Sequence, residues 1–252
     1  AALGLDIISG QDALDDTTIE RQSNYTELAG DLTGKKIGVI KEYFGEGLEA
    51  GVKNAIEQAV ERMKQAGAVV TEVSLPTLPL ALAVYYIVCP AEVSSNLARY
   101  DGQRFGHSVT DVNTLDESYE LARQQGFGAE AKRRIMTGAY VLSSGYYEAY
   151  YKKAQTVRTK LINEFNDVFK QVDFLVGPVA PTTAFKIGEN STDPLAMYLG
   201  DIMTVGVSMV GIPAISIPCG LADDMPVGLQ IMAPHKKDKE LLGVAKAYED
   251  LK

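Results

Sequence analysis

The sequence predicts an α/β protein in which a mixed sheet is flanked by helices, and three observations carry this prediction. Short apolar runs typical of buried strands occur near both ends of the chain, next to helical patterns. Long helical patterns without strands fill the middle. Finally, 46% of the 252 residues are hydrophobic and 23% are charged, which is the balance of a globular protein with a sizeable core.

The first elements form a strand–helix–strand unit. Lys36–Ile40 is a short apolar run that predicts a buried strand. From Val52 to Met63 the apolar residues recur every three or four positions, which predicts an amphipathic helix, and Gly67 follows as a helix-ending glycine. Residues 68–73 predict a second strand. Because the connections are short, we expect the two strands to be parallel.

Helical patterns dominate the middle of the chain, and strands return near its end. The apolar segment Leu80–Val88 predicts a buried helix, and three further helices are expected over residues 115–125, 128–142 and 145–171. We expect three later strands over residues 173–177, 214–217 and 227–231, and a last helix over residues 239–251.

Composition excludes several classes of protein. The 24 Lys and Arg against 33 Asp and Glu give a net charge of −9, which argues against a chain that grips nucleic acid by itself. The two cysteines, Cys89 and Cys219, support neither a disulfide framework nor a zinc site, so we expect no metal here and a reducing, cytoplasmic location. No apolar run approaches the length of a bilayer span, and we expect no membrane contact.

No local motif supplies a catalytic nucleophile. The sequence lacks the G-x-S-x-G and Walker patterns, and we interpret His107 and His235 as surface residues. Ser143 and Ser144 precede Gly145 in a way that resembles some amidases, but no glycine run there would let backbone N–H groups converge on an oxyanion. We interpret Ser143 or Ser144 as the cap of the long helix that follows.

Arg134 is the most informative charged residue. It shares a helix face with Ala131, Ile135, Gly138, Ala139 and Leu142, whereas Arg133 points toward water. A guanidinium on such a face needs an anion, because an unpaired buried charge is costly. That anion is either an internal Asp or Glu or the carboxylate of a ligand, and the pattern alone favours the internal pair.

Two other positions have alternative interpretations. Asp201 precedes an apolar run and is either a helix N-cap or an acceptor for an ammonium group. Tyr85 and Tyr86 lie in an apolar helix; either can fill the core while the other lines a pocket, and the sequence does not choose between them.

Three segments together resemble the C-terminal half of amidase-signature enzymes: Asp173–Thr183, Gly211–Gly220 and Pro226–Ile231. Three more narrow the resemblance to the A subunits of aspartyl/glutamyl-tRNA amidotransferases: Asn96–Gly106, Ser143–Gln155 and Asp193–Tyr198. The resemblance implies the amidase-signature fold with only its C-terminal half present. Residues 1–252 are then the C-terminal part of one amidase domain.

The resemblance also assigns site residues. The catalytic lysine and two serines of this family belong to an N-terminal half whose glycine- and serine-rich signature is not found here, so we carry over no catalytic residue. The glutamine-binding positions match Arg134 for the α-carboxylate, Asp201 for the α-ammonium and Tyr85 for the pocket wall. Together they would orient the side-chain amide of glutamine toward a nucleophile held elsewhere.

The implied function is part of the glutaminase component of a tRNA-dependent amidotransferase. Glutamine hydrolysis supplies ammonia that partner subunits use to convert Glu-tRNA(Gln), or Asp-tRNA(Asn), to the amide form. No cofactor is expected in this chain, with ATP and Mg expected on the partner, which also holds most of the tRNA. The alternatives are another amidase-signature hydrolase of small amides and a non-catalytic α/β binding module.

Overall fold

The structure is a computed structural model that describes residues 1–21, 24–189 and 194–251, with the backbone alone for residues 194–196. The chain forms two compact units. We call Ala1–Pro79 with Leu161–Lys252 the sheet unit and Leu80–Lys160 the helical unit. Each is described by itself. The prediction that residues 1–252 belong to one amidase domain stays a prediction.

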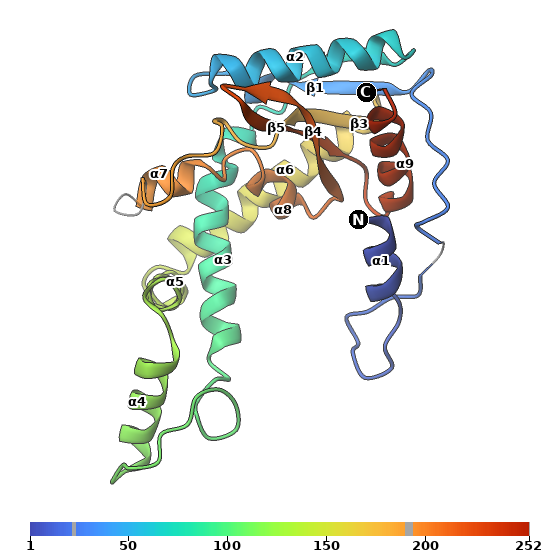
Figure 1. The fold of residues 1–252 in the computed structure, drawn as a ribbon. Coiled ribbons are helices and arrows are strands. Elements are labelled where there is room, and N and C mark those ends of the chain that lie inside the picture. The colour runs from blue at the N-terminus through green and yellow to red at the C-terminus, as the bar shows by residue number, and fades with distance from the viewer. Residues whose placement is uncertain (22–23, 190–193, 252) are drawn as a thin grey trace. The chain divides into compact units, whose positions relative to one another are not determined.

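The sheet unit contains a five-stranded mixed sheet in the order β2-β1-β3-β5-β4 (Figure 1). Its strands are β1 (Lys36–Ile40), β2 (Val69–Val73), β3 (Phe174–Pro178), β4 (Ala214–Ala222) and β5 (Met225–Met232). β1 pairs in parallel with β2 and β3, while β5 pairs antiparallel with β3 and β4. The predicted mixed α/β sheet and the parallel strand–helix–strand unit are therefore confirmed.

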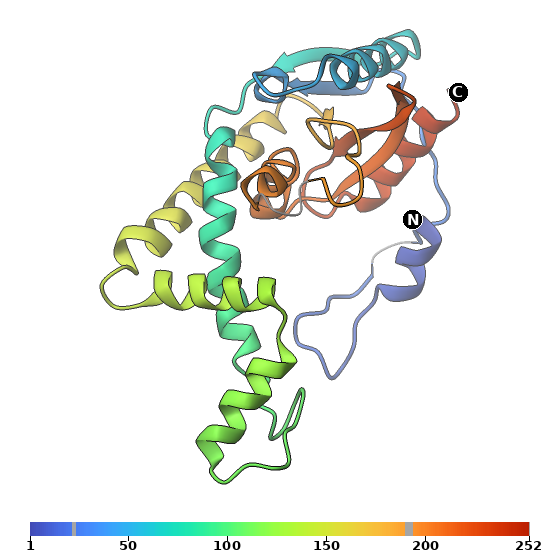
Figure 2. The ribbon, with the colours of Figure 1, turned by 60° about the vertical axis from the view of Figure 1, so that its left-hand side comes forward.

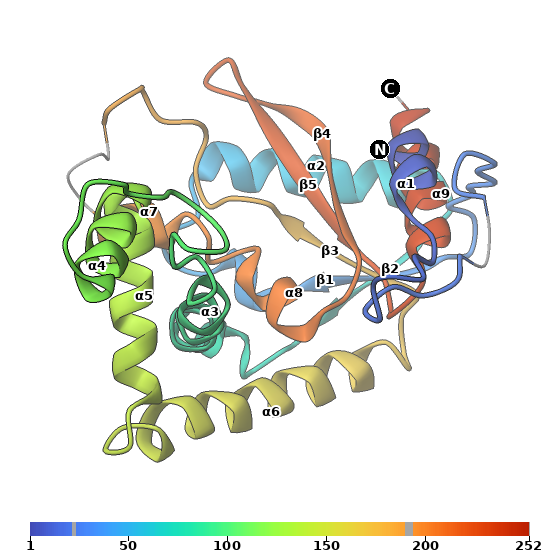
Figure 3. The same cartoon turned by 90° about the horizontal axis from the view of Figure 1, so that it is seen from below.

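The β4–β5 hairpin is longer than the sequence predicts (Figure 3). The prediction covered only residues 214–217 and 227–231, the parts of these strands with a continuous apolar pattern. The strands continue to a two-residue turn at Asp223 and Asp224, which have φ angles of 48° and 59°. Two left-handed residues are typical of tight hairpin turns, in which Asp is tolerated.

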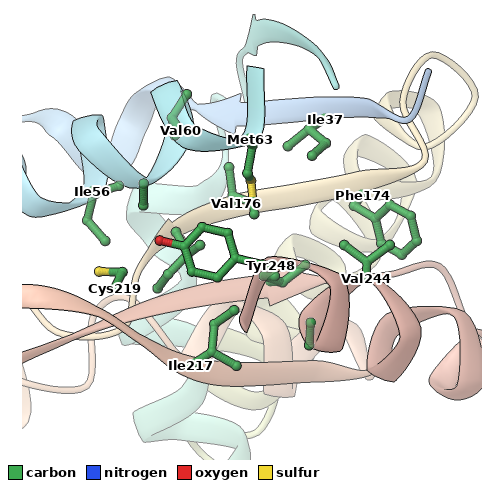
Figure 4. Packing of buried hydrophobic residues seen from close by; sticks show 14 of the residues in the cluster. Ile37, Ile56, Val60, Met63, Phe174, Val176, Ile217, Cys219, Val244 and Tyr248 are labelled. Carbon is green, nitrogen blue, oxygen red and sulfur yellow. The ribbon is translucent and has the colours of Figure 1, made fainter. Parts of the chain in front are cut away.

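One face of the sheet packs against α2 (Ala50–Gln65) and α9 (Asp238–Glu249) to form the main core (Figure 4). The predicted helix residues from Val52 to Met63 are buried in this cluster, as the periodicity indicated. Tyr248 of α9 is fully buried, and its hydroxyl accepts a hydrogen bond of 2.6 Å from Arg62 Nη2. The partly buried guanidinium thus meets a polar partner at the edge of an apolar core.

The other face of the sheet carries α8 (Val205–Val210) and the second half of α6 (Lys153–Val168), which continues into this unit from the helical unit (Figure 1). Leu161 and Phe165 of α6 are fully buried, as are Leu175 of β3 and Met232 of β5. The remaining elements of the sheet unit are short: α1 (Ala2–Ile8), the 3-10 turn Lys41–Phe44 and α7 (Pro194–Leu199). A second 3-10 turn, Leu78–Leu80, begins in this unit and ends at the first residue of the helical unit.

The helical unit consists of α3 (Ala81–Leu97), α4 (Leu115–Gly126), α5 (Ala129–Leu142), the π-helical turn Glu148–Lys152 and the start of α6. The predicted helices are confirmed, except that the one expected over 145–171 begins with the π turn. The capping prediction for Ser143 needs correction. Its hydroxyl donates to the carbonyl of Tyr140 at 2.8 Å, so Ser143 closes α5 rather than capping the next helix through its side chain.

The expectation that no segment is long enough to span a membrane also needs correction. Leu78–Leu97 is a 20-residue helical stretch that is long and apolar enough to cross a bilayer by length and composition. A core helix of a soluble protein meets the same criteria, and α3 packs one face against α5 within the helical unit. The stretch is therefore weak evidence for a membrane span.

Candidate functional site

The candidate site is built where α5 crosses α3 in the helical unit (Figure 2). Gly138 of α5 lies so close to α3 that an added Cβ would stand 2.0 Å from the carbonyl oxygen of Pro90. Because the side chain of glycine is a single hydrogen, the backbones of α5 and α3 can come into contact at this position. Arg134 lies one helical turn before Gly138, which places its side chain against the preceding turns of α3.

Arg134 contacts two side chains of α3. Its Nη1 lies 3.4 Å from the Tyr85 hydroxyl, a long hydrogen bond, and 3.9 Å from the Cys89 Sγ. Tyr85 and Cys89 are four residues apart and so share one helix face. The Arg134 side chain is 28% exposed, so it lines the surface at this crossing rather than the interior. The structure thus brings together two of the three predicted substrate-binding residues.

The favoured internal partner of Arg134 is present. Arg134 Nε donates to Glu130 Oε1 at 2.9 Å across one turn of α5. The other oxygen of the same carboxylate, Glu130 Oε2, pairs with Nη1 of Arg133, which is 52% exposed and faces water as predicted. Of the five residues that share the predicted face with Arg134, only Gly138 is buried and Ala139 is exposed; the other buried residue of α5 is Val141, which the pattern did not include.

The charges in this cluster hold one another in their ionised forms. The Arg134 hydrogen bond is the largest cause that lowers the pKa of the Glu130 carboxyl below its ordinary value. Hydrogen bonds to Tyr85 and then Glu130 raise the pKa of Arg134 further above its usual range.

The Tyr85 hydroxyl keeps its own proton at neutral pH. The Arg134 hydrogen bond lowers the pKa of Tyr85, but burial and the Cys89 thiol outweigh it, so the net pKa is raised. The hydroxyl accepts from Arg134, and its O–H can donate to a ligand oxygen in place of the Cys89 sulfur.

Asp201 belongs to the sheet unit, ahead of α8. Its backbone carbonyl accepts hydrogen bonds from the N–H groups of Thr204 at 2.9 Å and Val205 at 3.0 Å. Thr204, not Asp201, is the N-cap residue of α8, so the N-cap interpretation is wrong. The ammonium-binding role of Asp201 stays a prediction. Asp193, at the start of one motif segment, lies outside the described residues.

A cavity of about 530 Å³ lies within the sheet unit close to Asp201 in sequence. Gly200, Ile202 and Met203 line it together with Tyr43 and Phe185, and most of its wall is apolar. The Tyr43 hydroxyl donates to the Met203 carbonyl at 2.9 Å and so fixes one side of the wall. Asp201 itself is not among the residues that line this cavity in the described structure.

Sequence reasoning missed Glu130 and Cys89 as neighbours of Arg134. The spacing of Glu130 and Arg134, at i and i+4 on one helix, was a usable signal for their ion pair. Cys89 had no such signal, because its contact depends on how α5 crosses α3. Among the described residues, no group of three or more His, Cys, Asp or Glu side chains has metal-binding geometry.

Comparison with known proteins identifies the family. A family model described as Amidase matches residues 1–242, so the chain belongs to the amidase family. It is 51% identical to the A subunit of the glutamyl-tRNA(Gln) amidotransferase of Caldanaerobacter subterraneus subsp. tengcongensis, over 98% of this chain and 51% of that protein. The chain spans about half the length of the curated relatives it matches.

Solved structures confirm the expected amidase-signature fold. The A subunit of the glutamyl-tRNA(Gln) amidotransferase of Thermotoga maritima superposes with a TM-score of 0.77 at 37% identity, over 99% of this chain and 50% of that one. A bacterial aryl acylamidase of the amidase-signature family superposes with a TM-score of 0.75 at 20% identity, over 100% of this chain and 50% of that one. The second likeness shows the fold alone.

Proposed function

We propose that this chain is the substrate-orienting part of a glutamine-hydrolysing subunit in a tRNA-dependent amidotransferase. The observation that carries the proposal is the arrangement at Arg134. Glu130 occupies its Nε, while Nη1 lies beside a tyrosine hydroxyl that can donate to a ligand. Within the described part of the chain, Nη2 has no hydrogen-bond partner. This edge of the guanidinium suits a carboxylate, which arginine binds with two parallel hydrogen bonds.

The chemistry follows from what a free amino acid presents. Glutamine carries an α-carboxylate for Arg134 and Tyr85 and an α-ammonium for Asp201. Fixing both ends would aim the side-chain amide at the reacting group. The reacting serine, its lysine and the bridging serine would come from outside these 252 residues. An acyl-enzyme would then form and hydrolyse, with backbone N–H groups holding the oxyanion.

The ammonia would pass to partner subunits that amidate an activated glutamate on misacylated tRNA. The relatives are named for glutamyl-tRNA(Gln), which favours Glu-tRNA(Gln) over Asp-tRNA(Asn) as the substrate. We place ATP and Mg²⁺ on a partner chain of the complex, and most of the tRNA contact there too, because this chain has a net charge of −9. We expect the complex to be cytoplasmic.

A substrate panel on the complete amidotransferase tests the proposal. Glutamine is compared with 4-aminobutanamide, which lacks the α-carboxylate, and with glutaramic acid, which lacks the α-ammonium. We expect glutamine to be preferred over both. Arg134→Ala should raise the KM for glutamine by roughly 10- to 150-fold, since a charge-assisted contact contributes about 1.5–3 kcal/mol.

Each analogue lacks one charged group of glutamine and therefore tests the residue proposed to bind that group. Arg134→Ala should leave turnover of 4-aminobutanamide unchanged, and Asp201→Asn should do the same for glutaramic acid. Lys152→Ala, which removes an exposed cation of the helical unit, is the matched control and should change nothing. Unchanged glutamine kinetics in Arg134→Ala, or a preference for neutral amides in the parent enzyme, would point to a hydrolase of small amides instead.

A further inference from the structure

A single carboxylate in the helical unit joins two neighbouring arginines. Glu130 lies in the first turn of α5 and accepts from Arg134 Nε through one oxygen and from Arg133 Nη1 through the other. The sequence motifs do not include this glutamate, and in the proposed function it only occupies Nε of Arg134. Its ion pair with Arg134 nevertheless determines which N–H groups of the Arg134 guanidinium remain available to a ligand.

The planar geometry of the guanidinium determines which of its edges a ligand carboxylate can bind. Its five N–H groups lie in one plane, and a carboxylate can bind either the side edge containing Nε or the end edge formed by Nη1 and Nη2. Glu130 takes Nε at 2.9 Å. A ligand carboxylate is therefore directed to the Nη1–Nη2 edge, where Nη1 already lies 3.4 Å from the Tyr85 hydroxyl.

The second arginine keeps the cluster cationic. A lone Glu130 would neutralise Arg134 and weaken its attraction for an anion. Because Arg133 pairs with the other oxygen of Glu130, the three side chains together retain one positive charge. The Arg134 side chain is 28% exposed, so solvent does not fully screen that charge from a bound ligand.

From these contacts we propose that Glu130 is a positioning residue for recognition of the α-carboxylate. It holds the Arg134 guanidinium in one orientation before substrate arrives, so less rotational freedom is lost on binding. The inference rests on the proposed function, because it assumes that Arg134 binds glutamine. It adds a residue that makes no contact with the substrate and yet determines selectivity for amides bearing a carboxylate.

The test measures the ratio of kcat/KM for glutamine to that for 4-aminobutanamide in the complete amidotransferase. Glu130→Ala removes the acceptor, and we expect this ratio to fall about tenfold through KM for glutamine, with kcat little changed. Glu130→Gln keeps an oxygen that can accept from Nε, so it should restore most of the ratio. A general loss of folding would lower turnover of both substrates together and leave the ratio unchanged.

Glu148→Gln is the matched control. Glu148 also pairs with a basic residue four positions later in the helical unit, at 2.7 Å, but it is exposed and has no link to Arg134. It should leave the ratio unchanged. If Arg134→Ala lowers the ratio and Glu130→Ala does not, the positioning role is wrong. If Arg134→Ala also leaves the ratio unchanged, the proposed function itself is wrong.

Discussion

The two units of the molecule differ in what they bury. The sheet unit encloses large side chains, including Phe165, Phe174, Ile231 and Tyr248. In the helical unit, every buried hydrophobic residue among those described is alanine or valine. Its helices instead approach through small residues, as at Gly138 against Pro90. The first unit therefore gains its stability from apolar burial, whereas the second depends on close backbone contact that also positions Arg134.

The largest effect should come from a cavity in the sheet unit. Ile231 on β5 is fully buried between β3 and β4. Ile231→Ala should lower the free energy of unfolding by about 2–5 kcal/mol, because the transfer and cavity terms add. Urea denaturation measures this, and hydrogen exchange should show the lost protection across β1, β3 and β5.

Leu221→Ala is the control for that substitution. Leu221 lies in the same hairpin but is 65% exposed, so its truncation should change stability by no more than about 0.5 kcal/mol. Equal effects of the two substitutions would mean that the sheet unit is not held together by its buried face.

The two cysteines give a second comparison of the units. Cys219 in the sheet unit is 3% exposed, while Cys89 in the helical unit is half-buried beside Arg134. Iodoacetamide should therefore modify Cys89 about 100-fold faster, because Cys219 reacts only after local opening. Peptide mapping by mass spectrometry follows both sites. The difference should vanish in denaturant, and similar rates in the folded protein would contradict the burial difference.

The smallest of these effects should come from overpacking in the helical unit. Gly138→Ala places a methyl group against the Pro90 carbonyl, so α5 must move away from α3 at a cost of about 1–3 kcal/mol. Hydrogen exchange should increase in α3 and α5. Gly145→Ala is the matched control, since an added Cβ there meets no atom within 4 Å. If both variants keep full protection, the close crossing does not hold this unit together.

Local sequence patterns predicted most elements but not their extent. The helix from Val52 to Met63 and the strand Lys36–Ile40 were predicted because their apolar spacing is regular. The outer half of the β4–β5 hairpin was missed because exposed Gly220 and Leu221 interrupt the alternation. Asp201 was misjudged as a cap, because α8 begins four residues later, after an intervening turn.

The amino-acid sequence alone determined the α/β class through its periodicity and the family resemblance through its motifs, and that resemblance implied Tyr85, Arg134 and Asp201 as candidates. Only the tertiary structure decided that Tyr85 and Cys89 lie beside Nη1 of Arg134. That arrangement depends on the crossing of two helices at Gly138, and contact between segments distant in sequence leaves no periodic signal in either one.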